Sequence, residues 1–349
     1  MQAYKHAYQH ADTLVFGMTP EDGEMRAVVV DRFGGPEVLL VRNVPVPDPE
    51  PDQILIKVES AGIGVWDVAE REGRLAKMFG IQPKFPWVLG SEGAGRIVAV
   101  GDKVSGFTSG DLVYGDIWST TATTKTGFYA EYAALNMNHA WPIPNNVTIE
   151  QAGALLIDGA TALRGLDTLA LNQGEKLMIF GASGGLGHLA VQLGRRLGAR
   201  VFAVASGEDG VALAQRLGAE VAVDGHRGNI DDRARNFASN GFDAALITVP
   251  GEAAEKALTL VRDGGRVAYP WVNQRPAPKA PSTVRIYGYN SNVDRELVDK
   301  LNKLVDAGSF EVHLGKTFPL DRVVDAFQAV GSHHLGRIAL LPNSVHPGV

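Results

Sequence analysis

Residues 176–193 have the sequence KLMIFGASGGLGHLAVQL. They begin with a short apolar run at 177–180, which predicts a buried parallel strand. A glycine-rich turn follows, and apolar side chains then recur at the spacing of one helix face. These side chains are Leu186, Leu189, Ala190 and Leu193. Strand, tight turn and helix in this order are the context in which a glycine fingerprint indicates a dinucleotide-binding βαβ unit.

The small residues of this turn have distinct expected roles. Ala182 and Gly184 keep the turn tight and let the backbone approach a pyrophosphate, while Gly187 lets the helix pack close to the strand. The free N–H groups at the start of the helix face the anion. We therefore expect the cofactor to contact Ala182, Ser183, Gly184, Gly185, Leu186 and Gly187. Since alanine replaces the first glycine of the fingerprint, the alternative is a glycine-rich turn that binds nothing.

Alternating strands and helices continue after the turn. A second strand is expected at 199–205, about twenty residues on, as a βαβ unit requires. Further strands are expected at 220–223, 242–248 and 265–269, with helices at 209–217, 230–238 and 252–262. Alternation of this kind predicts an α/β fold of the Rossmann type, a doubly wound parallel sheet with crossover helices.

Length and composition limit the class of protein. The chain has 349 residues, enough for two domains, with 45% hydrophobic and 21% charged residues, as in ordinary globular proteins. A net charge of -6 does not indicate a basic surface for nucleic acid binding. No apolar stretch reaches the roughly 18 residues that span a bilayer. With no cysteine, disulfides and thiolate ligands are excluded. The lack of a secretory signal suggests the cytoplasm.

The N-terminal part predicts an extension and a β-rich domain. Residues 1–24 are expected to be a flexible N-terminal extension, an upstream start, or an arm that packs on a partner subunit. From 25 to about 145, short strands separated by Gly, Pro and Asp favour a small barrel. One helix at 149–169 is expected to lead into the parallel sheet. After a proline-rich joint, a strand at 283–289, a helix at 294–306 and a final strand at 337–341 are expected.

Several long motifs together carry a family resemblance. In order, they are FGGPEVL, VESAGIGVWDVAEREG, LGSEGAGRIVAVGDKVSGFTSGDLVYG, GFYAEYAAL, GASGGLGHLAVQLGRRLGA, DGGRVAYP and HHLGRIALLP. The chain resembles the medium-chain dehydrogenase/reductase superfamily, in its zinc-free quinone oxidoreductase branch. The resemblance implies a GroES-like β-barrel domain at 25–150 and 278–349, discontinuous around a Rossmann domain at 151–277. It also implies a nicotinamide cofactor in the cleft between them and a homodimer or tetramer.

Departures from zinc-dependent members of this family predict a site without metal. Where those members have a cysteine this chain has Gly64, where they have a histidine it has Ser91, and the third ligand position falls near Leu156. A catalytic zinc needs about three protein ligands, which Glu92 alone does not provide. His333 and His334 are expected to be a solvated loop pair.

The end of the second predicted strand bears on the choice of cofactor. Dinucleotide sites for NAD usually place an acid there to hold the ribose, whereas this chain has Ser206 and Gly207. We therefore expect NADPH, with NADH less favoured. Glu208 and Asp209 follow directly and could bend back, so the alternative stays open. The candidates to clasp a 2′-phosphate are His226 and Arg227, for which a solvated turn is the equal alternative.

Other residues are expected near the reacting groups because of the resemblance or their position at strand ends. Gly64, Trp66 and Asp67 match the family segment under the nicotinamide, with Trp66 either a substrate wall or simply core. Asp158 is an acid in an apolar segment, either a perturbed catalytic group or a capping residue, and Thr161 follows it. Strand ends are expected to flank the nicotinamide at Thr248, Val249, Pro250, Tyr269 and Pro270. Tyr129 and Tyr132 fit a substrate contact or a buried strand equally well.

These observations predict a reductase. We expect a zinc-independent, NADPH-dependent oxidoreductase that transfers a hydride to quinones or related activated carbonyl compounds, so that its substrate is small and apolar or aromatic. One alternative is an enone or enoyl-thioester reductase on the same fold. The other is a non-catalytic nucleotide-binding scaffold.

Overall fold

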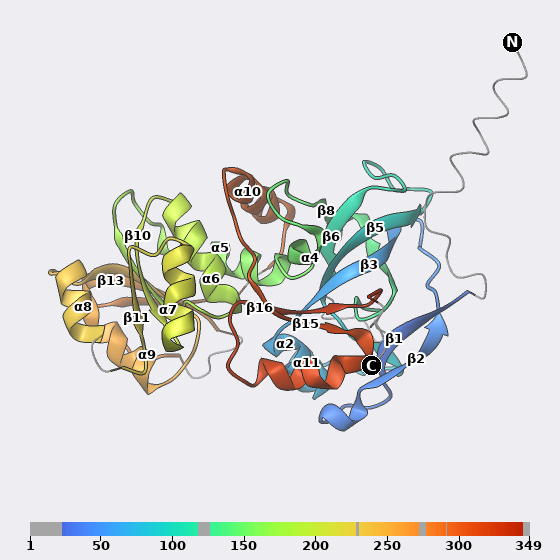
Figure 1. The fold of residues 1–349 in the computed structure, drawn as a ribbon, viewed down its shortest axis with the longest axis horizontal. Helices are drawn as coiled ribbons and strands as arrows, with labels where there is room; N and C mark the ends of the chain where they lie inside the picture. Colours follow the sequence, from blue (N-terminus) through green and yellow to red (C-terminus); the bar gives the residue numbers. More distant parts are fainter. Residues whose placement is uncertain (1–22, 118–125, 228–229, 272–276, 291, 345–349) are drawn as a thin grey trace, which may run out of the picture.

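The computed structural model describes residues 23–117, 126–227, 230–271, 277–290 and 292–344. A parallel sheet with its helices forms one end of the molecule, and an antiparallel β-rich unit forms the other (Figure 1). Between these two parts lie α5 (Leu156–Leu169), α6 (Gly185–Arg196) and β16 (Arg337–Leu341).

The parallel sheet has the strand order β11-β10-β9-β12-β13-β14. These strands are β9 (Lys176–Phe180), β10 (Arg200–Ala205), β11 (Val221–Asp224), β12 (Phe242–Ile247), β13 (Val261–Pro270) and β14 (Arg285–Tyr289). Since side chains alternate along a strand, Leu177 and Ile179 face one core while Met178 faces the opposite one. Both faces are buried, so the predicted doubly wound sheet is confirmed.

Helices cover both faces of this sheet. The core shared with Leu177 includes side chains from α5, α6, α7 (Gly207–Arg216) and α10 (Arg295–Asp306). The opposite core includes side chains from α8 (Ile230–Phe237) and α9 (Glu252–Ala257). The glycine turn between β9 and α6 therefore lies at the carboxyl edge of a central strand, where ligands of such sheets bind.

The β-rich unit contains a seven-stranded and a three-stranded sheet. The larger has the order β15-β16-β3-β5-β6-β8, with β7 also paired to β3, and the smaller has the order β2-β1-β4. The strands are β1 (Glu24–Val30), β2 (Leu40–Pro45), β3 (Gln53–Ile63), β4 (Trp87–Val88), β5 (Glu92–Val100), β6 (Leu112–Asp116), β7 (Tyr132–Asn136), β8 (Ala140–Pro142) and β15 (Leu314–Pro319). Short helices complete the unit: α2 (Val65–Arg71), α3 (Arg74–Phe79), α4 (Ile149–Ala152) and α11 (Val323–Val330).

The end of the chain returns to its N-terminal half. β16 pairs antiparallel with β3, with Ile338 opposite Ile63. The strand expected at 283–289 behaves differently: β14 pairs with β13 and completes the parallel sheet, so its assignment to the barrel domain was wrong. A strand's own sequence does not say which sheet edge it joins. α10 (Arg295–Asp306), also expected in the barrel domain, packs on the parallel sheet as well. We propose that the two-domain division otherwise follows the predicted boundaries.

The helix predicted at 149–169 is broken. The structure has α4 and α5 instead, because the backbone after Gly153 leaves the α-helical hydrogen-bond pattern. The Leu155 N–H donates to the carbonyl oxygen of Ala152, three residues back, and the Gly153 carbonyl oxygen accepts from the Gly62 N–H of β3 at 2.8 Å. This break gives α5 a free N-terminus of its own. The Ile157 N–H of its first turn donates outside the helix, to Oε2 of Glu92 at 2.8 Å.

The extension predicted for residues 1–24 overlaps the first strand of the fold. Residues 1–22 lie outside the described residues, while Glu24 pairs with Pro45 in β1 and so belongs to the fold, not to an extension. Within the part of the chain that the structure describes, no helix is both long and apolar enough to cross a membrane.

Candidate cofactor site and a buried ion cluster

The glycine turn leaves room on its outer side. A Cβ on Gly187 would lie 2.0 Å from the carbonyl oxygen of Gly181, so this position requires glycine for the helix to pack on the strand. A Cβ on Gly184 would meet only that same oxygen among the described residues, at 3.6 Å. Gly184 precedes α6, whose first N–H groups have no partner within the helix. Open space in front of these donors suits an anion.

The end of β12 lies beside this turn. The hydroxyl of Thr248 donates to the carbonyl oxygen of Phe180 at 2.9 Å, and a Cβ on Gly181 would lie 3.0 Å from the Val249 side chain. The structure thus brings Thr248 and Val249 to the glycine turn, with Pro250 next in the chain. Tyr269 and Pro270 end β13, which β12 separates from β9.

A polar network, which we call the ribose-end network, lies at the end of β10. The backbone N–H of Ser206 donates to Oγ of Ser183 at 3.1 Å, and Oγ of Ser206 lies 3.1 Å from Nε2 of His226. Asp224 accepts from the N–H groups of Gly207 and His226, at 3.2 and 3.0 Å. These bonds, that from His226 foremost, keep the pKa of Asp224 below its ordinary value.

Arg227, the expected phosphate clasp, is already held by acids in this network. Its guanidinium lies 2.7 Å from Oε1 of Glu208 and 3.5 Å from Oδ2 of Asp224. Both the Arg227 and the Glu208 side chains are exposed, so these contacts can be exchanged for a ligand. Asp224 was not among the predicted site residues, although it directly follows the third strand expected from the sequence.

A buried ion cluster lies where the two parts of the molecule meet. Arg337 of β16 donates through Nη2 to Oε1 of Glu92 in β5 at 2.5 Å, and through Nη1 to Oδ2 of Asp158 in α5 at 2.7 Å. Its Nε donates to the carbonyl oxygen of Ala154 at 3.0 Å. All three charged residues are buried, and the guanidinium lies 4.9 Å from the centre of the Trp66 ring.

The cluster holds one cation and two carboxyl groups. Burial raises the pKa of Glu92 to about 7 and raises that of Asp158 above its ordinary value, while the charge of Arg337 opposes both shifts. With both carboxyls ionised, the cluster carries a net charge of -1 away from water. It contacts the glycine turn directly: a Cβ on Gly185 would lie 2.4 Å from Oδ2 of Asp158 and 3.1 Å from Cδ of Arg337.

The loop before α2 packs against this cluster. Asp67 accepts from the Gly64 N–H at 2.8 Å and from the Ser91 hydroxyl at 3.3 Å, so it caps the helix from a fully buried position. A Cβ on Gly64 would lie 2.4 Å from the Trp66 ring. Trp66 therefore covers the cluster and at the same time requires glycine at position 64.

The hydroxyl groups of two other expected site residues donate hydrogen bonds to backbone carbonyl oxygens. The Thr161 hydroxyl donates to the carbonyl oxygen of Ile157 at 2.6 Å, one turn back in α5. The Tyr129 hydroxyl donates to the carbonyl oxygen of Gly62 at 3.0 Å, and both Tyr129 and Tyr132 are buried.

These residues do not fit a zinc ion. No side chain can extend from position 64 without displacing Trp66, and the Ser91 hydroxyl is bonded to Asp67. The space between the carboxyl groups of Glu92 and Asp158 holds the Arg337 guanidinium, a cation already. Within the described ranges, no group of three or more His, Cys, Asp or Glu side chains could hold a metal.

The tail of the chain docks on α6. His188 is fully buried; its Nδ1 lies 2.9 Å from the carbonyl oxygen of Gly184, and its Nε2 lies 3.1 Å from the His313 N–H. These partners require Nδ1 to donate and Nε2 to accept, so the ring is neutral. Burial lowers the pKa of His188 to about 4, in agreement. The Gly336 N–H also donates to the carbonyl oxygen of Ser183 at 2.8 Å.

The histidine pair expected as a solvated loop has partners. The ring of His333 lies 3.0 Å from Oδ2 of Asp209 at the start of α7, although both side chains are about half exposed. Nδ1 of His334 lies 2.9 Å from the carbonyl oxygen of Ser332. The pair therefore helps to dock the tail beside the ribose-end network.

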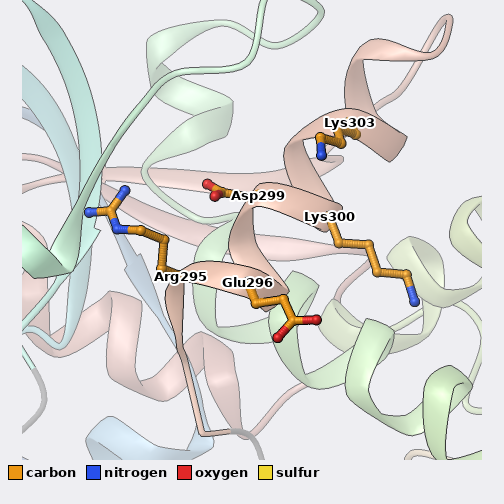
Figure 2. A pocket seen from close by; sticks show the side chains of 5 residues that line it. All are labelled: Arg295, Glu296, Asp299, Lys300 and Lys303. Atoms are coloured by element: carbon orange, nitrogen blue, oxygen red, sulfur yellow. The ribbon is translucent and has the colours of Figure 1, made fainter.

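A separate hollow of about 580 Å³ lies on α10 (Figure 2). It is lined by Arg295, Glu296, Asp299, Lys300 and Lys303. Lys300 is paired with Asp167 of α5 at 2.5 Å, and Arg295 lies over the Trp141 ring at 5.7 Å. These contacts explain Lys300 and Arg295 as part of the packing of α10 on its neighbours.

Comparison with known proteins places the chain in a family. Residues 50–145 match the family described as alcohol dehydrogenase GroES-like domain, and residues 185–279 match that described as zinc-binding dehydrogenase. The quinone oxidoreductase of Homo sapiens is 30% identical over 331 residues, which cover 91% of this chain and 98% of the human protein. The NADPH-dependent alkenal/one oxidoreductase of Arabidopsis thaliana chloroplasts is 30% identical and covers 91% of this chain, with 80% of its own length matched.

Solved structures support the same family assignment. A crystal structure described as an NAD-dependent alcohol dehydrogenase matches with a TM-score of 0.82 at 26% identity, over 91% of this chain and all of the other. The predicted family and the GroES-like domain are confirmed by these matches. The chain therefore belongs to the medium-chain dehydrogenase/reductase superfamily and is an oxidoreductase.

Proposed function

We propose that this oxidoreductase transfers a hydride from a nicotinamide dinucleotide, NADPH in preference to NADH, to quinones or related activated carbonyl compounds, without zinc. The observation that carries the proposal is the open space at Gly184, in front of the first N–H groups of α6. Residues 182–187 would hold the diphosphate there. When bound, the nicotinamide supplies the hydride.

The surroundings of the turn suit the rest of such a cofactor. Thr248 and Val249 lie beside Gly181, and together with Pro250, Tyr269 and Pro270 they would flank the nicotinamide half. The Trp66 ring, stacked under Arg337, would form an apolar wall for a flat acceptor. Asp67 acts through the backbone of Gly64 as a positioning residue.

The preference for NADPH rests on the ribose-end network. Ser206 and His226 are mutual hydrogen-bond partners, and the exposed Arg227 can turn from Glu208 to a 2′-phosphate. The name of the Arabidopsis relative supports NADPH. Asp224, which accepts from Gly207, is the feature that favours the alternative, because a carboxylate repels a phosphate and can hold a ribose.

Independence from zinc rests on the buried cluster. Because Arg337 lies between Glu92 and Asp158, the positive charge that a metal would supply is already part of the chain. We expect full activity after treatment with a chelator. About one zinc per chain by elemental analysis, with activity lost on chelation, would overturn this part of the proposal.

An acceptor screen tests the reaction. Oxidation of NADPH, with NADH in parallel, is followed by absorbance against a set of quinones and a set of enones. We expect turnover with quinones. Reduction of enones alone would favour the second candidate, an enone reductase, which the name of the Arabidopsis relative also supports. Binding of NADPH without turnover of either set would favour a nucleotide-binding scaffold.

We also propose a homodimer in the cytoplasm, with a tetramer as the alternative. β14 is the last strand of the parallel sheet, and its Ile286 and Tyr287 side chains are 36% and 37% exposed. An exposed strand edge with apolar side chains readily pairs with another chain. Light scattering during gel filtration tests this, and a monomer at micromolar concentration would contradict it.

A further inference from the structure

The cluster of Glu92, Arg337 and Asp158 lies against Gly185, which is within the proposed diphosphate site. Oδ2 of Asp158 and Nη1 of Arg337 lie 2.4 and 3.2 Å from the position of a Cβ on Gly185, the first residue of α6. A diphosphate in front of the α6 N-terminus would therefore lie close to a buried carboxyl group. Like charges at short range in a site shielded from water repel strongly.

The cluster cannot neutralise both of its carboxyl groups. Arg337 is its single cation, and it donates to both carboxyls and to the carbonyl oxygen of Ala154. The Trp66 ring covers a face of the guanidinium. When an anion binds nearby, protonation of one carboxyl group removes the excess negative charge at the lowest free-energy cost.

The two carboxyl groups differ in their capacity for that proton. Both oxygens of Glu92 accept hydrogen bonds, from Arg337 at 2.5 Å and from the Ile157 N–H at 2.8 Å. Asp158 accepts through Oδ2 from Arg337, which is its one donor among the described residues. A proton on Oδ1 of Asp158 therefore shares its oxygen with no existing hydrogen bond, whereas a proton on either oxygen of Glu92 would crowd a donor already bonded there. This difference counts above pH 7, where Glu92 is ionised.

We propose that binding of the nicotinamide dinucleotide at the glycine turn is coupled to the uptake of one proton from solvent, which Asp158 holds as a carboxylic acid against Gly185. This inference rests on the proposed function. It assigns Asp158 as a positioning residue for the cofactor.

Other ionisable groups face the cluster from each neighbouring element. Asp67 of α2 lies near Glu92 and Arg337, Tyr129 lies near Arg337, and His188 of α6 faces Arg337. Tyr289 of β14 and His334 lie near Asp158, and Tyr114 of β6 lies near Glu92; burial keeps the pKa of both tyrosines well above the ordinary value, so both are neutral. The Asp67 carboxylate accepts from the Gly64 N–H, the Tyr129 hydroxyl donates to Gly62, and His188 is neutral between two backbone partners. The half-buried His334 is the neighbour that a control must remove.

Calorimetry of the intact protein tests the coupling. NADPH and NADH are each titrated at pH 7.5 in phosphate and in Tris, whose ionisation enthalpies differ, and the difference in heat gives the number of protons taken up. NADH is included because its lack of a 2′-phosphate removes proton binding by the ligand. We expect the unaltered protein to take up most of one proton with either ligand, and Asp158→Asn to take up close to none. Asp167→Asn, the same change at a half-buried acid of α5 that is paired with Lys300, and His334→Gln should both behave as the unaltered protein.

A second measurement does not depend on the folding of the variants. In the unaltered protein, the Kd for NADH should rise towards tenfold per pH unit between pH 7 and 9, as expected for one linked proton. Tight binding with a flat profile and no proton uptake would overturn the inference alone, as would uptake that persists in Asp158→Asn. Binding of neither dinucleotide would overturn the proposed function, and the inference with it.

Discussion

The two ends of the proposed cofactor site use the same kinds of charged group in opposite surroundings. The ribose-end network sets Arg227 between Glu208 and Asp224, with the Arg227 side chain 67% exposed. The buried cluster sets Arg337 between Glu92 and Asp158, with the Arg337 side chain 3% exposed. Each arginine therefore has two acidic partners, but only one of the two arrangements is removed from water.

Burial determines what each arrangement can do. Exposed ion pairs are screened by water and salt, so the ribose-end network can exchange partners for a ligand at little cost. A buried charge must be matched, and loss of one partner leaves the others unpaired in a medium of low polarity. We therefore expect changes in the cluster to alter stability and proton binding, and changes in the ribose-end network to alter cofactor preference. Four predictions test this contrast.

The largest effect is expected for Arg337→Leu. This change leaves Glu92 and Asp158 buried without their cation, which should lower the free energy of unfolding by about 3–5 kcal/mol at pH 8. The loss should be smaller at pH 5.5, where the two carboxyls can be protonated. Chemical denaturation measures it. Arg227→Leu is the matched control at the exposed end and should leave stability nearly unchanged; equal losses in the two variants would contradict the contrast.

The next effect concerns His188, which is buried and neutral. Its pKa is about 4 in the folded protein and 6.5 in the unfolded chain. Between pH 6.5 and 4, His188 is therefore protonated in the unfolded chain but neutral in the folded protein. This group alone lowers the free energy of unfolding as pH falls from 6.5 to 4, by about 3 kcal/mol in all.

Glu92 acts in the opposite direction. Its raised pKa lets the folded protein hold a proton between pH 4.5 and 7, which stabilises the fold as pH falls through that range. The His188 contribution is therefore measured as a difference between proteins. We expect His188→Gln to be less stable at pH 7.5 but to lose less stability between pH 7.5 and 5 than the unaltered protein. His226→Gln, at the exposed end, should not change that slope; if it does and His188→Gln does not, the assignment fails.

The third prediction separates binding from folding within the glycine turn. Gly184→Val places its side chain in the open space and should weaken NADPH binding by at least about a hundredfold, or 2.7 kcal/mol. The melting temperature of the variant should stay close to that of the unaltered protein. Gly184 has an extended backbone that any residue adopts. Gly187→Ala, only three residues on, should instead destabilise the fold, because its Cβ would collide with Gly181. Unchanged NADPH affinity in Gly184→Val would remove the turn from the cofactor site.

The smallest effect is expected at the exposed end. Ser206→Asp places a carboxylate beside His226 and should weaken NADPH binding by about tenfold to a hundredfold, or 1–3 kcal/mol, with little effect on NADH or on stability. Ser206→Asn, which adds bulk without charge, is the control. Tighter binding of NADH than NADPH by the unaltered protein would show that Asp224 dominates this end of the site.

Local features were predictable because their causes are local. The strand, turn and helix of residues 176–193 are contiguous, so the roles of Gly184 and Gly187 could be assigned from spacing alone, and the structure provides the space and the close packing that those roles need. The ends of β10 and β12 were predictable for the same reason. Parallel strands bring their carboxyl ends to one edge, which is why Ser206 and Thr248 both contact the glycine turn.

Predictions failed where the deciding contact was distant. The helix expected at 149–169 is broken after Gly153, whose carbonyl oxygen accepts from the N–H of Gly62, far away in the sequence. β14 joins the parallel sheet because β13 offers an open edge, which its own five residues do not indicate. In the sequence, His188 is a polar residue within an apolar helix pattern. Its hydrogen-bond partner, the His313 N–H, reaches the ring only through the fold of the tail.

The sequence alone was enough for the family, the parallel sheet and the position of the glycine turn, since each depends on patterns within a few tens of residues. The buried cluster depends on the tertiary structure. Arg337 is 245 positions from Glu92 and 179 from Asp158, and no local pattern links them. In the sequence they are an acid beside Ser91, an acid in an apolar helix and an arginine before an apolar strand. Only the fold removes all three from water together, and burial gives these ordinary ionisable groups their shifted proton affinities.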